Sequence, residues 1–341
     1  ATGSGKTNSC FCLLDRLWKG HQTPWLVIEP AKTEYRHLRQ VAGLSDLRVY
    51  TLGDETVAPF RLNPFEFEIL DDEHRIHVQT HISHLRSVFG ASFVLYAPMP
   101  YVLDMCLHEV YQDKGWDLAT GRNRRAPRLL GDDGQPWPDL FPTLTELYHK
   151  VDEVVERLGY EERIEMDVKA GLKTRIDSLR LGGKGLMMDT RRGVPLGDLL
   201  RQPTVLELER IGDDDEKAFI IGLLLVRLYQ HRLIQARVRP PQPLEHVTVV
   251  EEAHRLLKNV PTEVSTEEAN VKGKAVEAFT NILSEIRAYG EGILIAEQIP
   301  TRLAPDAIKN TNLKLAHRLV AQDDRAAMAG AMNLDEDQAQ Y

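Results

Sequence analysis

The sequence predicts an α/β protein in which a mostly parallel sheet is interrupted by an inserted, all-helical domain. Three observations support this fold class. Residues 1–7 (ATGSGKT) match the last seven positions of the phosphate-binding loop G-x-x-x-x-G-K-[ST], and a helical pattern follows them. Short apolar strands alternate with helices in residues 1–70 and again in residues 201–341. Residues 71–200 show long helical periods and no clear strand.

The first part of the sheet domain, residues 1–70, contains one helix and two strands. The helical pattern that follows the loop ends at Gly20. The apolar stretches 25–28 and 48–52 predict strands, and the sequence RLNPF at 61–65 predicts a turn. Helix and strand therefore alternate, as a parallel sheet requires.

The inserted domain, residues 71–200, is predicted to be helical. Thr143 and Glu146 have the spacing of a capping box, which predicts a helix that runs to about Leu158. A further helix is expected over residues 161–181.

The second part of the sheet domain, residues 201–341, returns to short apolar strands. Acidic residues at 213–216 precede a predicted apolar helix over 218–233, where the helix dipole favours negative charge. Another helix is expected over 275–289. Strands are predicted at 204–208, 247–250, 293–296 and 314–320.

The composition is that of a soluble globular protein. Among the 341 residues, 43% are hydrophobic and 27% charged, which excludes disorder or a coiled coil for the whole chain. The longest uncharged apolar stretch, 218–226, is far shorter than the ~18 to 20 residues of a membrane span, so we expect neither a membrane span nor a signal peptide in these residues. The 3 cysteines fit a reducing compartment, so we expect a cytoplasmic protein. With a net charge of −9, any nucleic acid must bind a local basic surface.

The phosphate-binding loop carries the most specific chemistry. Its glycines let backbone N–H groups face phosphate oxygens, Lys6 neutralises phosphate charge, and Thr7 offers a hydroxyl to Mg²⁺. We expect ATP to be bound by Thr2, Gly3, Ser4, Gly5, Lys6, Thr7 and Asn8. Such a loop needs a buried strand before it, so we expect the chain to belong to a longer protein whose upstream segment completes the sheet.

Two later strands end in polar residues that suit hydrolysis. The strand 247–250 is followed by Glu251, which we assign to the Mg²⁺ shell, and by Glu252, which we assign as the base that polarises the attacking water. An adjacent pair of glutamates is otherwise a common solvated helix start. Gln298 follows the strand 293–296 and is placed to sense the γ-phosphate or the water; the alternative is a residue that caps a turn.

These motifs carry a resemblance. Residues 1–7, the sequence EEAH at 251–254, the strand before Gln298 and the sequence SEIRAYG at 284–290 together resemble the HerA/FtsK superfamily of ring-forming P-loop ATPases, nearest to the bacterial HerA-like DNA translocases. The resemblance implies a RecA-like core, a hexameric ring, ATP hydrolysis between neighbouring subunits, and passage of double-stranded DNA through the pore. It also makes Arg287 the candidate arginine finger that acts on a neighbour, although the family's first arginine is replaced by a serine. An exposed arginine at a helix end is the alternative.

The resemblance leaves three functions to compare. The first is a HerA-type motor that translocates or unwinds DNA, with a nuclease or another effector, in DNA processing or in defence against mobile DNA. The second is an ATPase of type IV secretion or conjugation that acts on protein or nucleoprotein, because the turn at 61–65 resembles one that those ATPases share. The third is a ring scaffold whose assembly is controlled by nucleotide. The segment 28–35 also resembles the superfamily's second-strand motif.

Two further patterns have simple alternatives. His74, His77, His81 and His84 fall on one arc of an expected helix, which is compatible with a metal site but more typical of the border of a packed face. The basic stretch 173–192 surrounds the glycine-rich sequence GGKG at 182–185, which is compatible either with a flexible DNA-contacting loop in a pore or with a solvated face.

Overall fold

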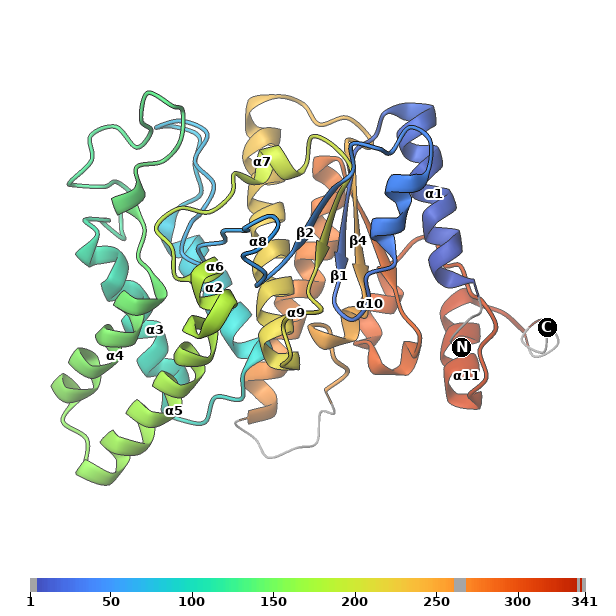
Figure 1. Cartoon of the computed structure of the whole chain (residues 1–341). Coiled ribbons are helices and arrows are strands. Elements are labelled where there is room, and N and C mark those ends of the chain that lie inside the picture. The colour runs from blue at the N-terminus through green and yellow to red at the C-terminus, as the bar shows by residue number, and fades with distance from the viewer. Residues whose placement is uncertain (1–4, 261–267, 336–337, 339–341) are drawn as a thin grey trace.

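The computed structural model describes residues 5–260, 268–335 and 338, and it contains one five-stranded parallel sheet (Figure 1). The strand order is β2-β3-β1-β4-β5, and every neighbouring pair is parallel. All five strands that we expected before residue 300 are present: β1 (Trp25–Glu29), β2 (Arg48–Thr51), β3 (Thr204–Glu207), β4 (His246–Glu251) and β5 (Glu291–Ala296). The parallel α/β fold class is therefore confirmed.

Helices cover both faces of this sheet and also form the inserted region. The α-helices are α1 (Lys6–His21), α2 (Val78–Ser92), α3 (Met99–Asp113), α4 (Leu144–Leu158), α5 (Glu162–Arg180), α6 (Gly182–Met188), α7 (Leu196–Leu199), α8 (Asp214–Val238), α9 (Glu268–Glu285), α10 (Pro305–Lys309) and α11 (Gln322–Met332). The 3₁₀-helices include η1 (Tyr35–Gln40), which follows β1, and η4 (Ile286–Tyr289), which precedes β5.

The sheet separates two apolar clusters. Successive side chains of a strand point to opposite faces, so Trp25 and Val27 of β1 pack with α1 and η1, whereas Leu26 and Ile28 join the larger cluster with α2, α8 and α9. The 25-residue helix α8 is apolar on most sides and largely buried, because the sheet lies on one side of it and the inserted helices on the other.

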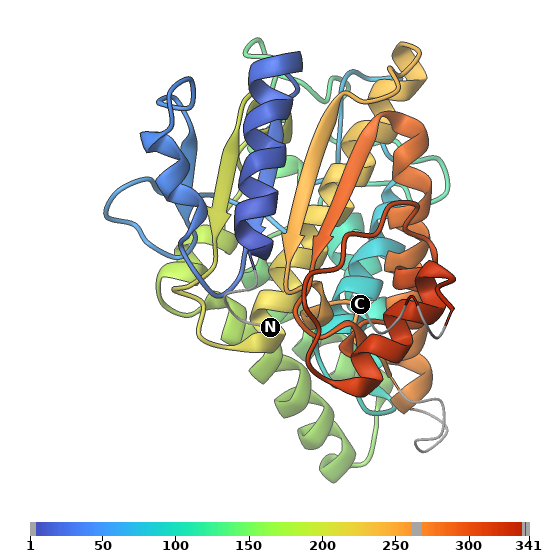
Figure 2. The same cartoon turned by 90° about the vertical axis from the view of Figure 1, so that its right-hand side faces the viewer.

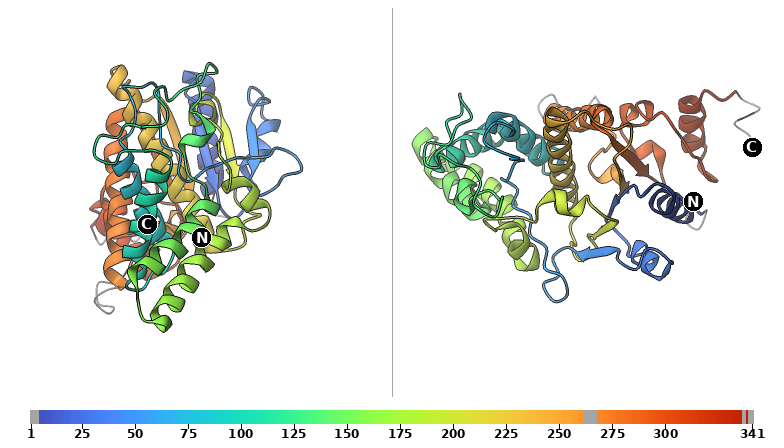
Figure 3. Two further views of the ribbon diagram at one scale, coloured as in Figure 1. Left: turned by 90° about the vertical axis from the view of Figure 1, so that its left-hand side faces the viewer. Right: turned by 90° about the horizontal axis from the view of Figure 1, so that it is seen from above.

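The inserted helices extend from the sheet domain at one end of the molecule, and α11 lies at the other end (Figure 3, right). The predicted capping box is present: Glu146 N–H donates to the Thr143 hydroxyl (3.3 Å), and Thr143 N–H donates to the Glu146 carboxylate (3.0 Å). One apolar cluster runs from the helices of the insertion through α8 to the sheet. The insertion therefore shares its core with the sheet domain.

The strand that we predicted at 314–320 is wrong. Residues 314–320 form no strand and pair with none of the five strands of the sheet. Leu315 (74%) and Val320 (69%) in this segment are exposed, as is Leu313 (90%) just before it. The His317 ring meets the hydroxyl of Ser9 in α1 at 3.2 Å.

The expected histidine stripe is also wrong. α2 begins only at Val78, so His74 and His77 precede it: His74 pairs with Asp71 (2.8 Å), and the His77 ring caps the helix. His81 and His84 face the interior, where burial lowers their pKa values to about 3 and about 4. Within the described ranges, no group of three or more His, Cys, Asp or Glu side chains is arranged to hold a metal ion.

The glycine-rich basic segment is not a flexible loop, because residues 182–188 form α6. Its glycines allow close approach of backbone: a Cβ on Gly183 would lie 2.0 Å from the carbonyl oxygen of Gly53. The surrounding cations have partners within the chain; Lys184, for example, pairs with Glu216 of α8. Similar pairs are Lys173–Asp152, Arg180–Asp177, Arg191–Asp139 and Arg192–Asp133.

Candidate functional site

The candidate site begins at the amino end of α1, which lies at the edge of the sheet toward which the strands point (Figure 2). Gly5 precedes the helix with φ at +93°, a left-handed conformation that favours glycine. Among the described residues, no side chain caps this helix end, and its first turn contains no acidic residue. The end therefore suits an anion, because its backbone N–H groups and its dipole both favour negative charge.

Lys6 and Glu251 come together at this edge, as expected. Lys6 Nζ donates to Glu251 Oε2 at 3.2 Å, across 245 residues of sequence. Glu251 ends β4 and is 8% exposed, and its other oxygen, Oε1, accepts a hydrogen bond from the hydroxyl of Tyr35 at 2.8 Å. Glu34 lies in the segment after β1, and its carboxylate accepts hydrogen bonds from Lys32 and from the Thr7 hydroxyl, which lower its pKa. Thr7 therefore lies next to this segment. The site thus joins α1, β4 and the segment after β1.

Sequence reasoning gave no role to Tyr35 or to two further glutamates at this edge. Glu29 ends β1 and Glu207 ends β3, so three neighbouring strands each place a carboxylate at the same edge. Burial raises the pKa of Glu29 to about 7, although the N–H groups of Glu34 (2.8 Å) and Tyr35 (3.4 Å) donate to it. The signal was visible in the sequence, because each of these apolar runs ends in glutamate.

Glu207 has a different environment from the other two. The Nε of Arg36 donates to it at 2.7 Å, and the hydroxyl of Thr51 donates at 2.8 Å. Its side chain is fully buried, so this pair anchors η1 to the sheet. Glu207 is therefore occupied structurally, whereas Glu251 meets the phosphate-binding helix.

Glu252 lies one residue beyond the metal-side candidate and points elsewhere. It adopts φ of +49°, an uncommon conformation for a residue other than glycine and one that concentrates at functional sites. Its carboxylate pairs with Arg255, with Nη2 at 2.7 Å from Oε2. The described contacts of Glu252 do not include Lys6, and the carboxylate of the expected base is held by an arginine three residues later.

Gln298 and Arg287 lie at opposite edges of the sheet. Glu251 is in register with Ala296, so Gln298 is two residues beyond the paired position, at the same edge as Lys6. Arg287 is exposed in η4, directly before β5. Since β5 has six residues and a strand rises ~3.3 Å per residue, Arg287 lies roughly 20 Å from that edge and cannot serve the site of its own chain.

The remaining expected ATP-binding residues divide by position. Asn8 is in the first turn of α1. Thr2, Gly3 and Ser4 lie outside the described residues, so their role stays a prediction.

Comparison with known proteins gives the fold. No family model matches the sequence, and a comparison with curated proteins finds no significant match. Among solved structures, VirB4 of Thermoanaerobacter pseudethanolicus aligns with 20% identity and a TM-score of 0.66, over 100% of this chain and 81% of VirB4. The bacterial conjugative coupling protein TrwB, in its unbound monoclinic form, aligns with 11% identity and a TM-score of 0.49, over 91% of this chain and 62% of TrwB. The chain therefore has the fold of VirB4.

Proposed function

We propose that this chain is a VirB4-like ATPase that hydrolyses ATP with Mg²⁺ and drives type IV secretion or conjugation. The observation that carries the ATPase is the convergence of Lys6, Thr7 and Glu251 at an uncapped helix end. This set provides a cation for phosphate together with hydroxyl and carboxylate oxygens, which are the ligands that Mg²⁺ prefers.

Each residue then has a defined task. Lys6 and the backbone N–H groups of the first turn of α1 hold phosphate oxygens. The Thr7 hydroxyl and the Glu251 carboxylate hold Mg²⁺, which neutralises charge on the phosphate oxygens when it is bound. Tyr35 positions Glu251 through its hydroxyl. The Mg²⁺ proposal thus uses oxygen donors that the structure brings to one edge of the sheet.

Glu252 is the proposed base for the attacking water, and Gln298 orients that water from the neighbouring strand end. Both Arg255 nitrogens donate to Glu252 Oε2, and no described donor bonds to Oε1, so Oε1 is the oxygen that accepts the proton in this proposal. In this proposal Arg287 completes the site of an adjacent copy, and the assembly is a hexameric ring. Because Arg287 lies far from the site of its own chain, any catalytic contact that it makes is with a neighbour.

Three observations favour secretion or conjugation over DNA translocation. The turn at 61–65 joins the sheet domain to the inserted helices: buried Asn63 accepts the N–H of Phe65 (2.8 Å) and donates to the carbonyl oxygen of Pro142 (3.0 Å). The likeness to VirB4 spans the sheet domain and the insertion alike. In addition, the cations proposed for DNA contact are engaged inside the chain. Within the described ranges, no helix combines the length and apolarity that a bilayer crossing requires.

ATP hydrolysis by four proteins tests the proposal. Lys6→Ala should abolish ATP binding, whereas Lys19→Ala, in the exposed last turn of the same helix, should leave it unchanged. Glu252→Gln should keep ATP binding and lose roughly 10²- to 10⁴-fold in rate. If Lys6→Ala hydrolyses ATP at the same rate as the unmodified chain, the site around Lys6 does not hydrolyse ATP and the proposal is wrong. Strong stimulation by double-stranded DNA would instead favour the translocating motor.

A further inference from the structure

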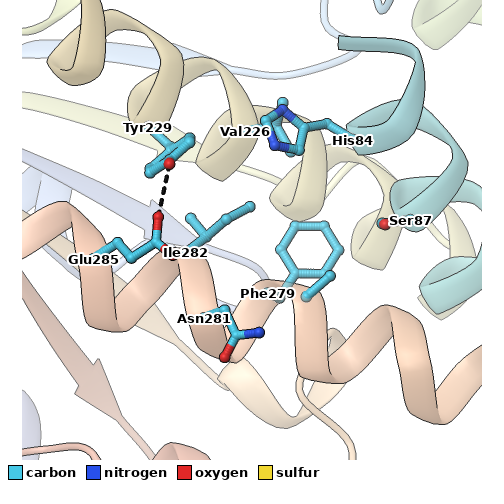
Figure 4. Close-up of a pocket in the computed structure, with 9 residues that line it drawn as sticks. His84, Ser87, Val226, Tyr229, Phe279, Asn281, Ile282 and Glu285 are labelled. Atoms are coloured by element: carbon cyan, nitrogen blue, oxygen red, sulfur yellow. Dashed lines mark hydrogen bonds between the residues drawn. The ribbon is translucent and has the colours of Figure 1, made fainter. Parts of the chain in front are cut away.

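A pocket of about 280 Å³ lies between α2, α8 and α9, on the face of the sheet opposite α1 (Figure 4). Its volume exceeds the ~150 Å³ of an engineered apolar cavity that binds benzene. One part of its wall is apolar and the other polar. The residues that matter here are Val226, Phe279 and Ile282 on the apolar part, and His84, Tyr229 and Glu285 on the polar part.

Glu285 brings an uncompensated negative charge to this pocket. The Tyr229 hydroxyl donates to Glu285 Oε2 at 2.7 Å, as the dashed line in Figure 4 shows. In the part of the chain that the structure describes, no donor reaches the other oxygen, Oε1, and no cation pairs with this carboxylate. Burial, followed by the bond to Glu285, raises the pKa of Tyr229, so the phenol stays a donor. Glu285 is an exposed residue, so this second oxygen faces solvent and is accessible to a ligand.

His84 does not supply the missing positive charge. Gln230 Nε2 donates to Nδ1 of His81 (2.9 Å) and to Nδ1 of His84 (3.0 Å). This arrangement assigns the proton of the neutral His84 ring to Nε2. Burial lowers the pKa of His84 to about 4, so the ring is neutral at pH 7 and the pocket has a net negative charge.

We propose that this pocket binds a small amphipathic cation, an ammonium group joined by a short chain to an aromatic body. The ammonium donates to Glu285 Oε1, and the Tyr229 ring beside it adds a cation–π contact. The aromatic body packs against Ile282, which keeps 7% exposure at the apolar wall, whereas Phe279 is fully buried behind that surface. An anionic ligand is disfavoured, since it would face Glu285 without a compensating cation.

The test is a calorimetric titration of the full chain with phenethylamine and, in parallel, with uncharged phenethyl alcohol. The amine should bind in a saturable manner and the alcohol about fivefold more weakly, which corresponds to one partly exposed ion pair. Glu285→Gln keeps an acceptor for Tyr229 but removes the charge. Its affinity for the amine should therefore fall about fivefold, and its affinity for the alcohol should not change. Glu277→Gln is the matched control, because Glu277 is exposed on α9 and does not line the pocket.

A second variant tests the location. Ala278 lines the pocket, so Ala278→Trp should fill it and abolish binding while the thermal unfolding midpoint shows a folded chain. Lys6→Ala should bind the amine normally, because the pocket lies on the other face of the sheet; failure of the ATPase proposal therefore leaves this one intact. Three results would each overturn the pocket proposal. The unmodified chain could bind the amine and the alcohol with equal affinity, or Glu285→Gln could bind the amine as tightly as the unmodified chain. The chain could also self-associate through Glu285 and bind no amine.

Discussion

Replacing Tyr35 by phenylalanine separates the positioning of Glu251 from the stability of the fold. The change removes one hydroxyl and keeps the ring, which packs edge-on against Phe11 at 5.0 Å. Burial raises the pKa of Tyr35, so in the unmodified chain the hydroxyl is always available as a donor. A hydrogen bond to a charged acceptor contributes about 1.5 to 3 kcal/mol. If that energy orients Glu251 toward the metal, its loss corresponds to about 10- to 100-fold in Mg²⁺ requirement.

The same range is typical of residues that orient metal ligands, which lose about 10- to 100-fold in affinity or activity when changed. The assay is ATP hydrolysis at fixed ATP across a Mg²⁺ titration. Tyr50→Phe is the control, because the Tyr50 ring packs on Phe60 and its hydroxyl has no hydrogen-bond partner among the described residues. Tyr35→Phe could lower the free energy of unfolding and still require the same Mg²⁺ concentration as Tyr50→Phe. In that case the Tyr35 hydroxyl stabilises the fold and does not position Glu251.

Three further predictions concern the same region. Burial raises the pKa of Glu29 from 4.5 to about 7, so its contribution to stability is full below pH 4.5 and is lost as the pH rises to about 7. Relative to Glu29→Gln, the unmodified chain should lose on the order of 3 kcal/mol across that window in urea unfolding, and a constant difference would contradict the burial argument. Gly183→Ala should destabilise the chain by about 1 to 3 kcal/mol, because its Cβ would lie 2.0 Å from the Gly53 carbonyl oxygen. In Lys6→Ala, Mg²⁺ without ATP should raise the thermal unfolding midpoint by roughly 2 °C more than in the unmodified chain, since Glu251 then lacks its cation.

The last two predictions have internal controls. Gly20→Ala places a methyl group where no atom lies within 4 Å, so it should not destabilise the chain as Gly183→Ala does. Lys19→Ala removes an exposed pair with Asp15, and its response to Mg²⁺ should equal that of the unmodified chain. Equal responses of Lys6→Ala and Lys19→Ala would show that Mg²⁺ does not replace Lys6 at Glu251.

The strands could be predicted because strands that are buried on both faces read as continuous apolar runs. β1 and β4 are such runs, and every residue in each is buried. The edge to which their carboxyl ends point followed from the parallel order, so the meeting of Lys6 and Glu251 was also predictable. Tyr35 was not, because its contact with Glu251 depends on the turn after β1, which joins residues 216 apart in sequence.

Two failures have a common physical cause. Residues 314–320 have strand-like composition, but a strand exists only when another strand satisfies its backbone groups, and this segment pairs with none of the described strands. Lys184 belongs to a basic stretch, but whether a cation is available to DNA depends on its neighbours in space, and Glu216 of α8 engages it. Local composition gave the character of each segment in both cases, and the tertiary partner decided its role.

The pair of Lys6 and Glu251 links the fold to the proposed chemistry. A carboxylate that is only 8% exposed needs a compensating cation, and Lys6 provides one at 3.2 Å. The proposed function assigns Lys6 to phosphate and Glu251 to Mg²⁺, so binding exchanges the partners of two charges that already neutralise each other. Neither charge is left buried alone before or after the exchange. Glu252 and Arg255 form a second pair one residue further on, through Glu252 Oε2. The proposed exchange therefore needs only the Lys6–Glu251 pair to open, because Glu252 Oε1 has no described donor to lose.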